Sequence, residues 1–264
     1  MHDDKKKLLD VRNLNVIFKN TGVVAINNIS FYLKPREIFA IVGESGSGKT
    51  SVALSITNLF KKKIMDISGH IMFEGTDLLS ISEKDMATYR GNKIMYIFQE
   101  PNLALNPSLT IGYQISESMK PKSKRNVINL MAEVGLTNER TYHAYPYELS
   151  GGMQQRAMIA IALASKPKLL IADEPTTSLD VTIQKQIMDL LKDIRKRYEL
   201  AILLITHNFG IINGFADRAM VMLNGKIEET NTVDAIFKNP KSPYTAKLLA
   251  CVPELGNPNK LNPK

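Results

Sequence analysis

The sequence contains a single cysteine, Cys251, among 264 residues, and it has no tryptophan. One thiol excludes an internal disulfide framework and any metal site built from several cysteines. No apolar run approaches the roughly 18–20 residues that a membrane-spanning helix needs. The longest run, residues 157–165, is bounded by Arg156 and Lys166. The first residues are charged and do not resemble the apolar core of a signal peptide. These absences favour an intracellular protein.

Charge gives little further direction. The formal net charge is +8 at pH 7, and either nucleic acid or an anionic membrane surface would attract such a chain. The basic residues are scattered, however, and the densest runs, residues 5–7, 61–63 and 120–125, contain no interleaved aromatic side chains. We therefore expect no nucleic-acid partner and a basic surface that is solvated or faces a membrane.

Apolar and polar residues alternate at the start of the chain. Leu9 and Val11, and then Leu14, Val16 and Phe18, repeat with the two-residue period of half-buried strands. This part of the chain is therefore predicted to be β structure with one face on a core.

The middle and later parts of the chain alternate between strand-like and helix-like segments. A continuous apolar segment, residues 38–42, predicts a buried strand that leads into a glycine-rich loop, and residues 52–60 then look helical. Residues 71–73 and 93–98 predict further strands. Residues 168–172 and 201–205 predict two more buried strands on either side of a helix over 183–198. Such alternation indicates an α/β fold with a mostly parallel core sheet.

Two segments depart from this alternation. Between about residues 101 and 165 the apolar spacing is helical, which predicts a helical subdomain inserted into the sheet domain. Near the end of the chain, Asn224-Gly225 lies between two short strand-like segments and suits the type I′ turn of a hairpin. We expect residues 8–253 to form one domain and residues 254–264, rich in Pro and Asn, to be a disordered tail.

The glycine-rich loop fits the phosphate-loop pattern. Its glycines let successive main-chain N–H groups point at an anion, and the following helix directs its positive end at the same place. Lys49 adds a positive charge at the β- and γ-phosphates, and the Thr50 hydroxyl can ligate Mg²⁺. The loop therefore predicts a site for a nucleoside triphosphate, most simply ATP, with Mg²⁺. The candidate nucleotide-binding residues are Gly43, Glu44, Ser45, Gly46, Ser47, Gly48, Lys49, Thr50 and Ser51.

A second element is an apolar strand that ends in the acids Asp173 and Glu174. Ligands of parallel sheets collect at the carboxyl ends of the strands, so Asp173 is expected beside Mg²⁺. Glu174 is then positioned to polarise an attacking water as a general base. In isolation such a strand end is more often an ordinary exposed acidic turn, but downstream of a phosphate loop it predicts hydrolysis of the triphosphate.

A third element, Leu149–Arg156, opens a helix with Ser150 as a natural N-cap and with Gly151 and Gly152 leaving the main chain approachable. A second anion-binding helix start is redundant within one subunit, but it is useful if it meets a nucleotide bound to another copy of the fold. With this Leu-Ser-Gly-Gly segment the chain resembles the nucleotide-binding domains of ATP-binding-cassette (ABC) proteins, over residues 8–253. The resemblance implies a phosphate-loop ATPase with an antiparallel β-subdomain and an inserted helical subdomain.

The same resemblance assigns further residues. Gln99 matches the glutamine that senses Mg²⁺ and the γ-phosphate, and Asp180 matches a loop that touches the opposite subunit. His207 matches the histidine that holds the γ-phosphate. The resemblance thus implies Glu174, His207 and Lys49 as catalytic residues. The implied metal ligands are Thr50, Gln99 and Asp173, and the implied additional nucleotide contacts are Gln99, Ser150, Gly151, Gly152 and Asp180.

Two positions depart from the family pattern. Met153 stands where the wider family usually has glutamine, which puts one polar contact to the partner's nucleotide in doubt. The family also stacks adenine on an aromatic residue of the first hairpin. Here Phe18 is the nearest candidate, and a purely structural role in the core is equally compatible with the sequence.

Several segments resemble the oligopeptide, dipeptide and nickel importer branch of the family. They are residues 98–107, 111–115, 149–156, 172–181 and 242–249, the last followed by Pro253. Some peptide-importing relatives continue with a cysteine-rich extension that holds an iron–sulfur cluster. With only Cys251 present, we expect no cluster, and nickel import stays open as an alternative to peptide import.

The resemblance implies a peripheral subunit at the cytoplasmic face of a membrane. Its implied partners are two permease subunits, a second ATPase subunit and an extracytoplasmic substrate-binding protein. The expected ATPase dimer is a heterodimer, with a homodimer as the alternative. A non-transport ABC ATPase or a simple phosphate-loop kinase is disfavoured. The former usually has two cassettes or a long coiled-coil insert, and the latter has no use for Leu149–Arg156.

Overall fold

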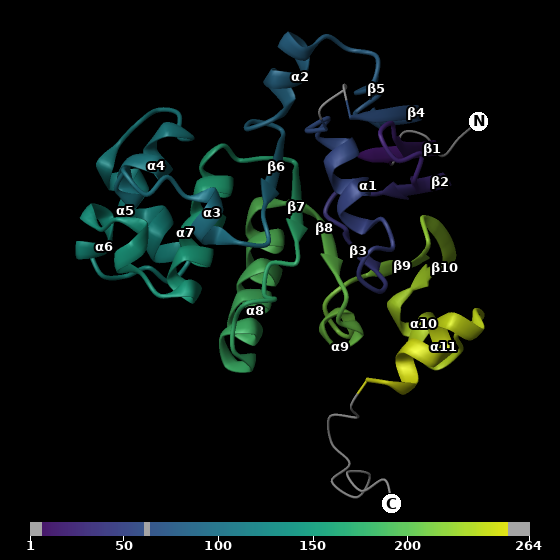
Figure 1. Ribbon diagram of the computed structural model, residues 1–264. Coiled ribbons are helices and arrows are strands. Elements are labelled where there is room, and N and C mark those ends of the chain that lie inside the picture. The colour runs from purple at the N-terminus through teal and green to yellow at the C-terminus, as the bar shows by residue number, and fades with distance from the viewer. Residues whose placement is uncertain (1–6, 61–63, 253–264) are drawn as a thin grey trace, which may run out of the picture.

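The computed structural model describes residues 7–60 and 64–252 (Figure 1). The strands are β1 (Leu9–Phe18), β2 (Val24–Leu33), β3 (Ile38–Val42), β4 (Met65–Phe73), β5 (Thr76–Asp77), β6 (Ile94–Ile97), β7 (Leu169–Asp173), β8 (Ala201–Thr206), β9 (Arg218–Leu223) and β10 (Lys226–Thr232). The helices are α1 (Lys49–Ile56), α2 (Glu83–Tyr89), α3 (Pro101–Ala104), α4 (Ile111–Glu117), α5 (Lys124–Glu133), α6 (Arg140–His143), α7 (Gly151–Ala164), α8 (Val181–Tyr198), α9 (Phe209–Ile212), α10 (Val233–Lys238) and α11 (Pro243–Ala250). The basic run 61–63 and the predicted tail 254–264 lie outside the described residues.

The central sheet has six strands in the order β10-β9-β3-β8-β7-β6. Strand β10 is antiparallel to β9, and the other neighbours are parallel, so the predicted mostly parallel sheet is confirmed. Both faces are covered, and alternate residues of β3 therefore belong to different cores. Ile38, Ala40 and Val42 pack into one core with α7 and α8, whereas Phe39 and Ile41 pack into the other with α1.

The second sheet is antiparallel, with the order β2-β1-β4-β5. Its inward residues, such as Leu9 and Ile29, join Phe39 and Val52 in one hydrophobic core. Figure 1 shows this sheet and α1 on one side of the molecule and helices α3 to α7 on the other. Residues 101–164 contain helices and no strand, as their apolar spacing predicts.

Two predicted boundaries were wrong. The helix expected over residues 52–60 is α1, Lys49–Ile56. It begins inside the loop because Gly48, with φ of 101°, turns the chain directly into the helix, and it ends early because Asn58 takes a positive φ. The strand expected at 71–73 is the longer β4, whose first half contains Asp66, Ser68 and Gly69, residue types that are uncommon in strands.

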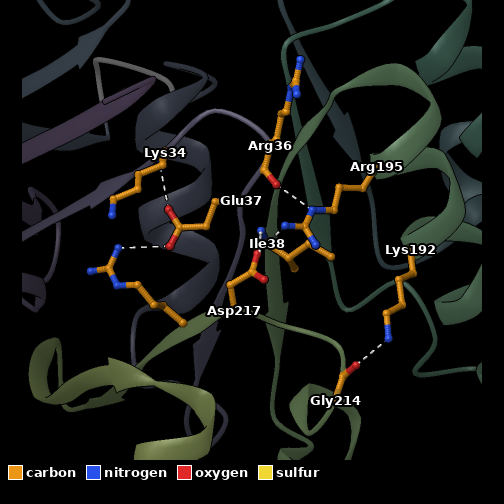
Figure 2. A network of polar contacts seen from close by, with 9 residues as sticks. Lys34, Arg36, Glu37, Ile38, Lys192, Arg195, Gly214 and Asp217 are labelled. Carbon is orange, nitrogen blue, oxygen red and sulfur yellow. Dashed lines mark hydrogen bonds and ion pairs between the residues drawn. The ribbon is translucent and has the colours of Figure 1, made fainter. Parts of the chain in front are cut away.

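A polar network fastens α8 to the sheet at the amino ends of the parallel strands, away from the glycine-rich loop (Figure 2). Arg195 of α8 donates to the Arg36 carbonyl at 2.6 Å and pairs with Asp217 at 2.8 Å. Asp217 also accepts the main-chain N–H of Ile38 at 2.8 Å. The side chains of Arg195 and Asp217 therefore join α8 to β3 and to the turn before β9.

Candidate nucleotide-binding site

A cleft of about 930 Å³ lies where the parallel strands end. It collects residues from the β1–β2 hairpin, the glycine-rich loop, the ends of β6, β7 and β8, the β9–β10 turn and α11. The predicted site residues in its lining are Gly43, Glu44, Ser45, Gly46, Gly48, Lys49, Thr50, Ser51, Gln99, Glu174 and His207. Ser47 and Asp173 are buried, with 3% and 5% of their surface exposed. Segments more than 100 residues apart in the sequence therefore form one site.

The loop is shaped by close main-chain packing. Gly48 has a φ of 101°, and a Cβ placed there would lie 2.5 Å from the Ala25 carbonyl oxygen. The β9–β10 turn supports the loop from the same side, because Gly225 donates its N–H to the Ser47 carbonyl at 3.0 Å. The loop is consequently held between two hairpins, and no larger residue fits at position 48 without displacing the main chain.

Lys49 is almost completely buried, and its ammonium lies within the loop. It donates to the carbonyls of Gly43 at 2.9 Å and Glu44 at 2.7 Å. Burial lowers the pKa of Lys49, and the charges of Glu174 and Asp173 partly offset this effect. The cleft thus has a pre-positioned cation at its base, coordinated by loop carbonyls.

Oxygen atoms suited to Mg²⁺ meet beside Lys49. The Thr50 hydroxyl is 3.4 Å from one oxygen of Asp173, and the Tyr96 hydroxyl donates to the other at 2.7 Å. Burial raises the pKa of Asp173, an effect only partly opposed by the hydrogen bonds from Tyr96 and Thr50. Hydroxyl and carboxylate oxygens are the donors that Mg²⁺ prefers, and a cation would offset the cost of burying this carboxylate. The residues present therefore fit the metal.

Tyr96 was not among the predicted site residues. Its position on β6, paired in register with Ile171 of β7, puts it next to Asp173, but that pairing depends on the strand order. Burial and the nearby Asp173 charge raise the pKa of Tyr96, so its hydroxyl remains a donor at neutral pH. An unusual polar residue in a short apolar strand, Ile94–Ile97, was the only available signal.

Glu174 follows β7 with a φ of 47°, an uncommon conformation for a residue with a side chain. One carboxylate oxygen accepts the Thr177 hydroxyl at 2.6 Å, and the other lies 2.9 Å from Nδ1 of His207. Burial acts to raise the pKa of Glu174, but the contacts with Thr177 and His207 outweigh it and leave the pKa below its usual value. The carboxylate is therefore oriented and ionised. Thr177 is a second site residue that the sequence analysis missed.

The other end of the cleft is apolar. Phe18, Val23 and Val24 line it, and the last two expose 56% and 47% of their surface. Phe18 also packs against a hydrophobic core, which confirms its structural role, whereas stacking on adenine stays a prediction. An exposed apolar wall of this kind suits the flat face of a base.

The Leu149–Arg156 segment lies elsewhere. Ser150 caps α7 by accepting the Met153 N–H at 3.4 Å, and Asp180 caps α8 by accepting the Ile183 N–H at 3.0 Å. The two helix starts are neighbours, since a Cβ on Gly152 would lie 2.9 Å from Cγ2 of Ile183. Among the described residues, neither Ser150, Gly151, Gly152 nor Asp180 lines the cleft. Met153 packs against the core of its own chain.

A family model described as "ABC transporter" matches residues 26–177, more than half of the chain. The chain belongs to this ABC transporter family. A second model, "Oligopeptide/dipeptide transporter, C-terminal region", matches residues 228–264, which include the segment 242–249 that resembles the same branch.

Relatives and solved structures agree with this membership. The chain is 47% identical to the peptidoglycan transport ATP-binding protein YejF of Agrobacterium fabrum, over 94% of the chain but only 47% of that protein. It is 46% identical to the oligopeptide transport ATP-binding protein OppD of Bacillus subtilis, over 94% of the chain and 73% of that protein. The chain thus spans about half of the first relative and about three quarters of the second.

The fold is that of ABC cassettes. The dimeric post-hydrolysis structure of the ATP-binding cassette MJ0796 with ADP and Pi superposes with a TM-score of 0.75 at 26% identity, covering 85% of this chain and 98% of that one. The predicted α/β phosphate-loop fold is confirmed. Within residues 7–60 and 64–252, no helix combines the length and apolar character needed to cross a membrane.

Proposed function

We propose that the chain is the ATP-binding and ATP-hydrolysing subunit of an ABC importer that takes up peptides. The observation that carries this proposal is the single cleft in which the glycine-rich loop, Gln99, Glu174 and His207 meet. An anion-binding loop, a buried cation and an oriented carboxylate are together suited to hydrolysing a phosphoanhydride bond, whereas a binding module has no use for the carboxylate.

The triphosphate lies along the loop, with its base against Phe18 and Val24. Lys49 transfers its hydrogen bonds from the loop carbonyls to phosphate oxygens, which lowers the cost of its burial. Thr50, Asp173 and Gln99 would hold Mg²⁺, which would supply positive charge to offset that of the phosphates. Each of these groups is already within or beside the cleft.

Hydrolysis proceeds by in-line attack of water on the γ-phosphorus. Glu174 accepts a proton from that water, while Lys49 and His207 stabilise charge on the transferred phosphoryl group. For this, His207 must exchange its contact with Glu174 for one with the γ-phosphate. Thr177 keeps the carboxylate oriented during the exchange through its 2.6 Å hydrogen bond.

Turnover requires a second ATPase subunit. Ser150, Gly151, Gly152 and Asp180 lie outside the chain's own cleft, so they are free to meet the nucleotide of a facing subunit. Two subunits then enclose two ATP molecules, closing when ATP binds and reopening after hydrolysis. Either a heterodimer, which we favour, or a homodimer satisfies this geometry.

Peptides are the substrate class that the relatives favour. The family model that matches the C-terminal residues is described as an oligopeptide/dipeptide transporter region, and OppD is named for oligopeptide transport. The proposed partners are two permease subunits, to which the chain binds at the cytoplasmic face of the membrane, and an extracytoplasmic peptide-binding protein.

The proposal is tested at two levels. Calorimetry should detect ATP binding to the purified chain, and Lys49→Ala should weaken it strongly; unchanged affinity in this variant would count against the site. In cells, the chain should be recovered from washed membranes with permease subunits, and the cognate binding protein should carry peptides. Recovery of a nickel chelate from that protein would replace peptide import by nickel import, and a freely soluble pool bound to DNA or ribosomes would exclude transport.

A further inference from the structure

The C-terminal helix α11 reaches the nucleotide cleft. Leu248 of α11 lies in the lining together with the glycine-rich loop and His207. This helix belongs to the segment that matches the C-terminal region of oligopeptide and dipeptide transporters, outside the residues that match the ABC transporter model. Its contribution to the cleft therefore comes from the branch-specific part of the chain.

A buried carboxylate anchors the start of α11. Glu229 of β10, only 7% exposed, accepts the main-chain N–H groups of Lys241 at 3.0 Å and Ser242 at 3.1 Å. Thr245, one turn into the helix, is completely buried. Since amides at a helix start have no partners within the helix, this carboxylate fixes both the position and the direction of α11.

Residues of α11 and of the turn that follows it lie against two segments of the nucleotide cleft. Tyr244 and Leu248 are four residues apart on α11 and therefore share a face, and Val252 lies just beyond the end of the helix. The Tyr244 hydroxyl is buried without a hydrogen-bond partner, and burial raises the pKa of Tyr244, an effect that the nearby Glu44 main chain partly opposes. At the other end, Val252 lies against Gly210 of α9, where a Cβ would be 3.8 Å from its Cγ1 atom.

Tyr244 thus lies beside the start of the glycine-rich loop, and Val252 lies beside the turn after His207. We propose that α11 forms a third wall of the nucleotide cleft and that Leu248 is a positioning residue, holding these two segments at the spacing that a bound nucleoside triphosphate requires. The inference rests on the proposed function, because it assigns Leu248 to the same cleft. It gives the C-terminal segment a direct role in nucleotide affinity.

The test measures binding of adenylyl imidodiphosphate, a non-hydrolysable ATP analogue, to the full chain by calorimetry. Leu248→Ala should raise the Kd about three- to tenfold, in line with the loss of apolar contact area, and Leu248→Met should restore it to within about twofold. Leu249→Ala is the matched control, because Leu249 is also partly buried against the core but does not line the cleft. It should leave the Kd unchanged although it costs comparable stability.

A second measurement needs no variant. Amide hydrogen exchange in residues 244–250 of the wild-type chain should slow when the analogue binds. Unchanged exchange there, or a Kd for Leu248→Ala equal to that of the wild type, would overturn the role of α11 alone. Absence of any analogue binding by the wild type would overturn the proposed function as well, which separates the two failures.

Discussion

The Nδ1 atom of His207 lies 2.9 Å from Oε1 of Glu174, so two of the three residues with proposed catalytic roles contact each other directly. Thr177 holds the second carboxylate oxygen at 2.6 Å. The carboxylate is therefore oriented before substrate arrives, and the imidazole is placed to shift from the carboxylate to a phosphate oxygen. Turnover then requires that the contact between His207 and Glu174 breaks while the hydrogen bond between Thr177 and Glu174 is kept.

Glu174→Gln should abolish turnover without preventing ATP binding. The amide keeps the shape of the side chain but cannot accept a proton, and loss of a general base typically costs about 10²–10⁴-fold in rate. Phosphate release should fall by this factor, and size-exclusion chromatography with MgATP should show a trapped closed dimer. Turnover near that of the wild type would refute the role of Glu174.

The same carboxylate predicts a pH dependence of stability. Its pKa is lower in the folded chain than the ordinary value of 4.5, so the folded state favours the ionised form. The resulting stability is present above about pH 4.5 and is lost as the pH falls through the lower folded-state pKa. Urea unfolding of the nucleotide-free chain between about pH 5 and pH 3 should show a smaller acid-induced loss in Glu174→Gln than in the wild type. Equal losses in the two proteins would contradict this linkage.

Sequence patterns predicted the parts of the site that are contiguous in the chain. The glycine-rich loop and the Asp173–Glu174 strand end carry their chemistry in neighbouring residues, and the structure brings them into one cleft with Gln99 and His207. Tyr96 and Leu248 were missed for a physical reason. Tyr96 acts across the β6–β7 pair and Leu248 reaches the cleft from α11, and no local pattern encodes either position.

In the fold, too, features encoded by local patterns were predicted, and features that depend on long-range contacts or unusual backbone conformations were not. The parallel sheet follows from strand–helix alternation, whereas the ends of α1 depend on the left-handed conformations of Gly48 and Asn58. The contact between α8 and the turn before β9 joins Arg195 and Asp217, which are 22 positions apart and carry no recognisable motif. Polar contacts between residues that are distant in the sequence are thus the part of this structure that sequence patterns predict least well.

Ser150 tests whether the site is shared between subunits. Ser150→Ala should lower phosphate release strongly while the isolated chain still binds ATP normally, because Ser150 does not line its own cleft. The matched control is Ser82→Ala, which removes a similar N-cap from α2, where Ser82 accepts the Asp85 N–H at 3.1 Å. Each variant should lose about 1 kcal/mol of stability, and only Ser150→Ala should lose turnover. A matching fall in both variants would indicate a merely structural role.

Tyr96 tests the proposed Mg²⁺ site. Tyr96→Phe removes the hydroxyl that orients Asp173, and loss of such a partner typically weakens metal binding about 10–100-fold. The Mg²⁺ concentration for half-maximal ATP turnover should rise by at least about tenfold, whereas ATP affinity without Mg²⁺ should not change. Tyr89→Phe is the control, since Tyr89 packs edge-on against Phe73 in the antiparallel part of the fold. An unaltered Mg²⁺ requirement in Tyr96→Phe would exclude this positioning role.

The network around Asp217 tests whether stability and nucleotide binding are separable in this fold. Asp217→Ala removes the acceptor of the Ile38 N–H and the partner of Arg195, leaving a buried amide unsatisfied, which typically costs about 1–3 kcal/mol. Asp66→Ala, which breaks an exposed ion pair with Lys19, should cost about 0–1 kcal/mol. Urea unfolding measures both losses, and calorimetry should find the same ATP affinity in the two variants, since the network lies at the strand ends remote from the cleft. If ATP affinity fell in Asp217→Ala but not in Asp66→Ala, the attachment of α8 to the sheet would instead affect the nucleotide site.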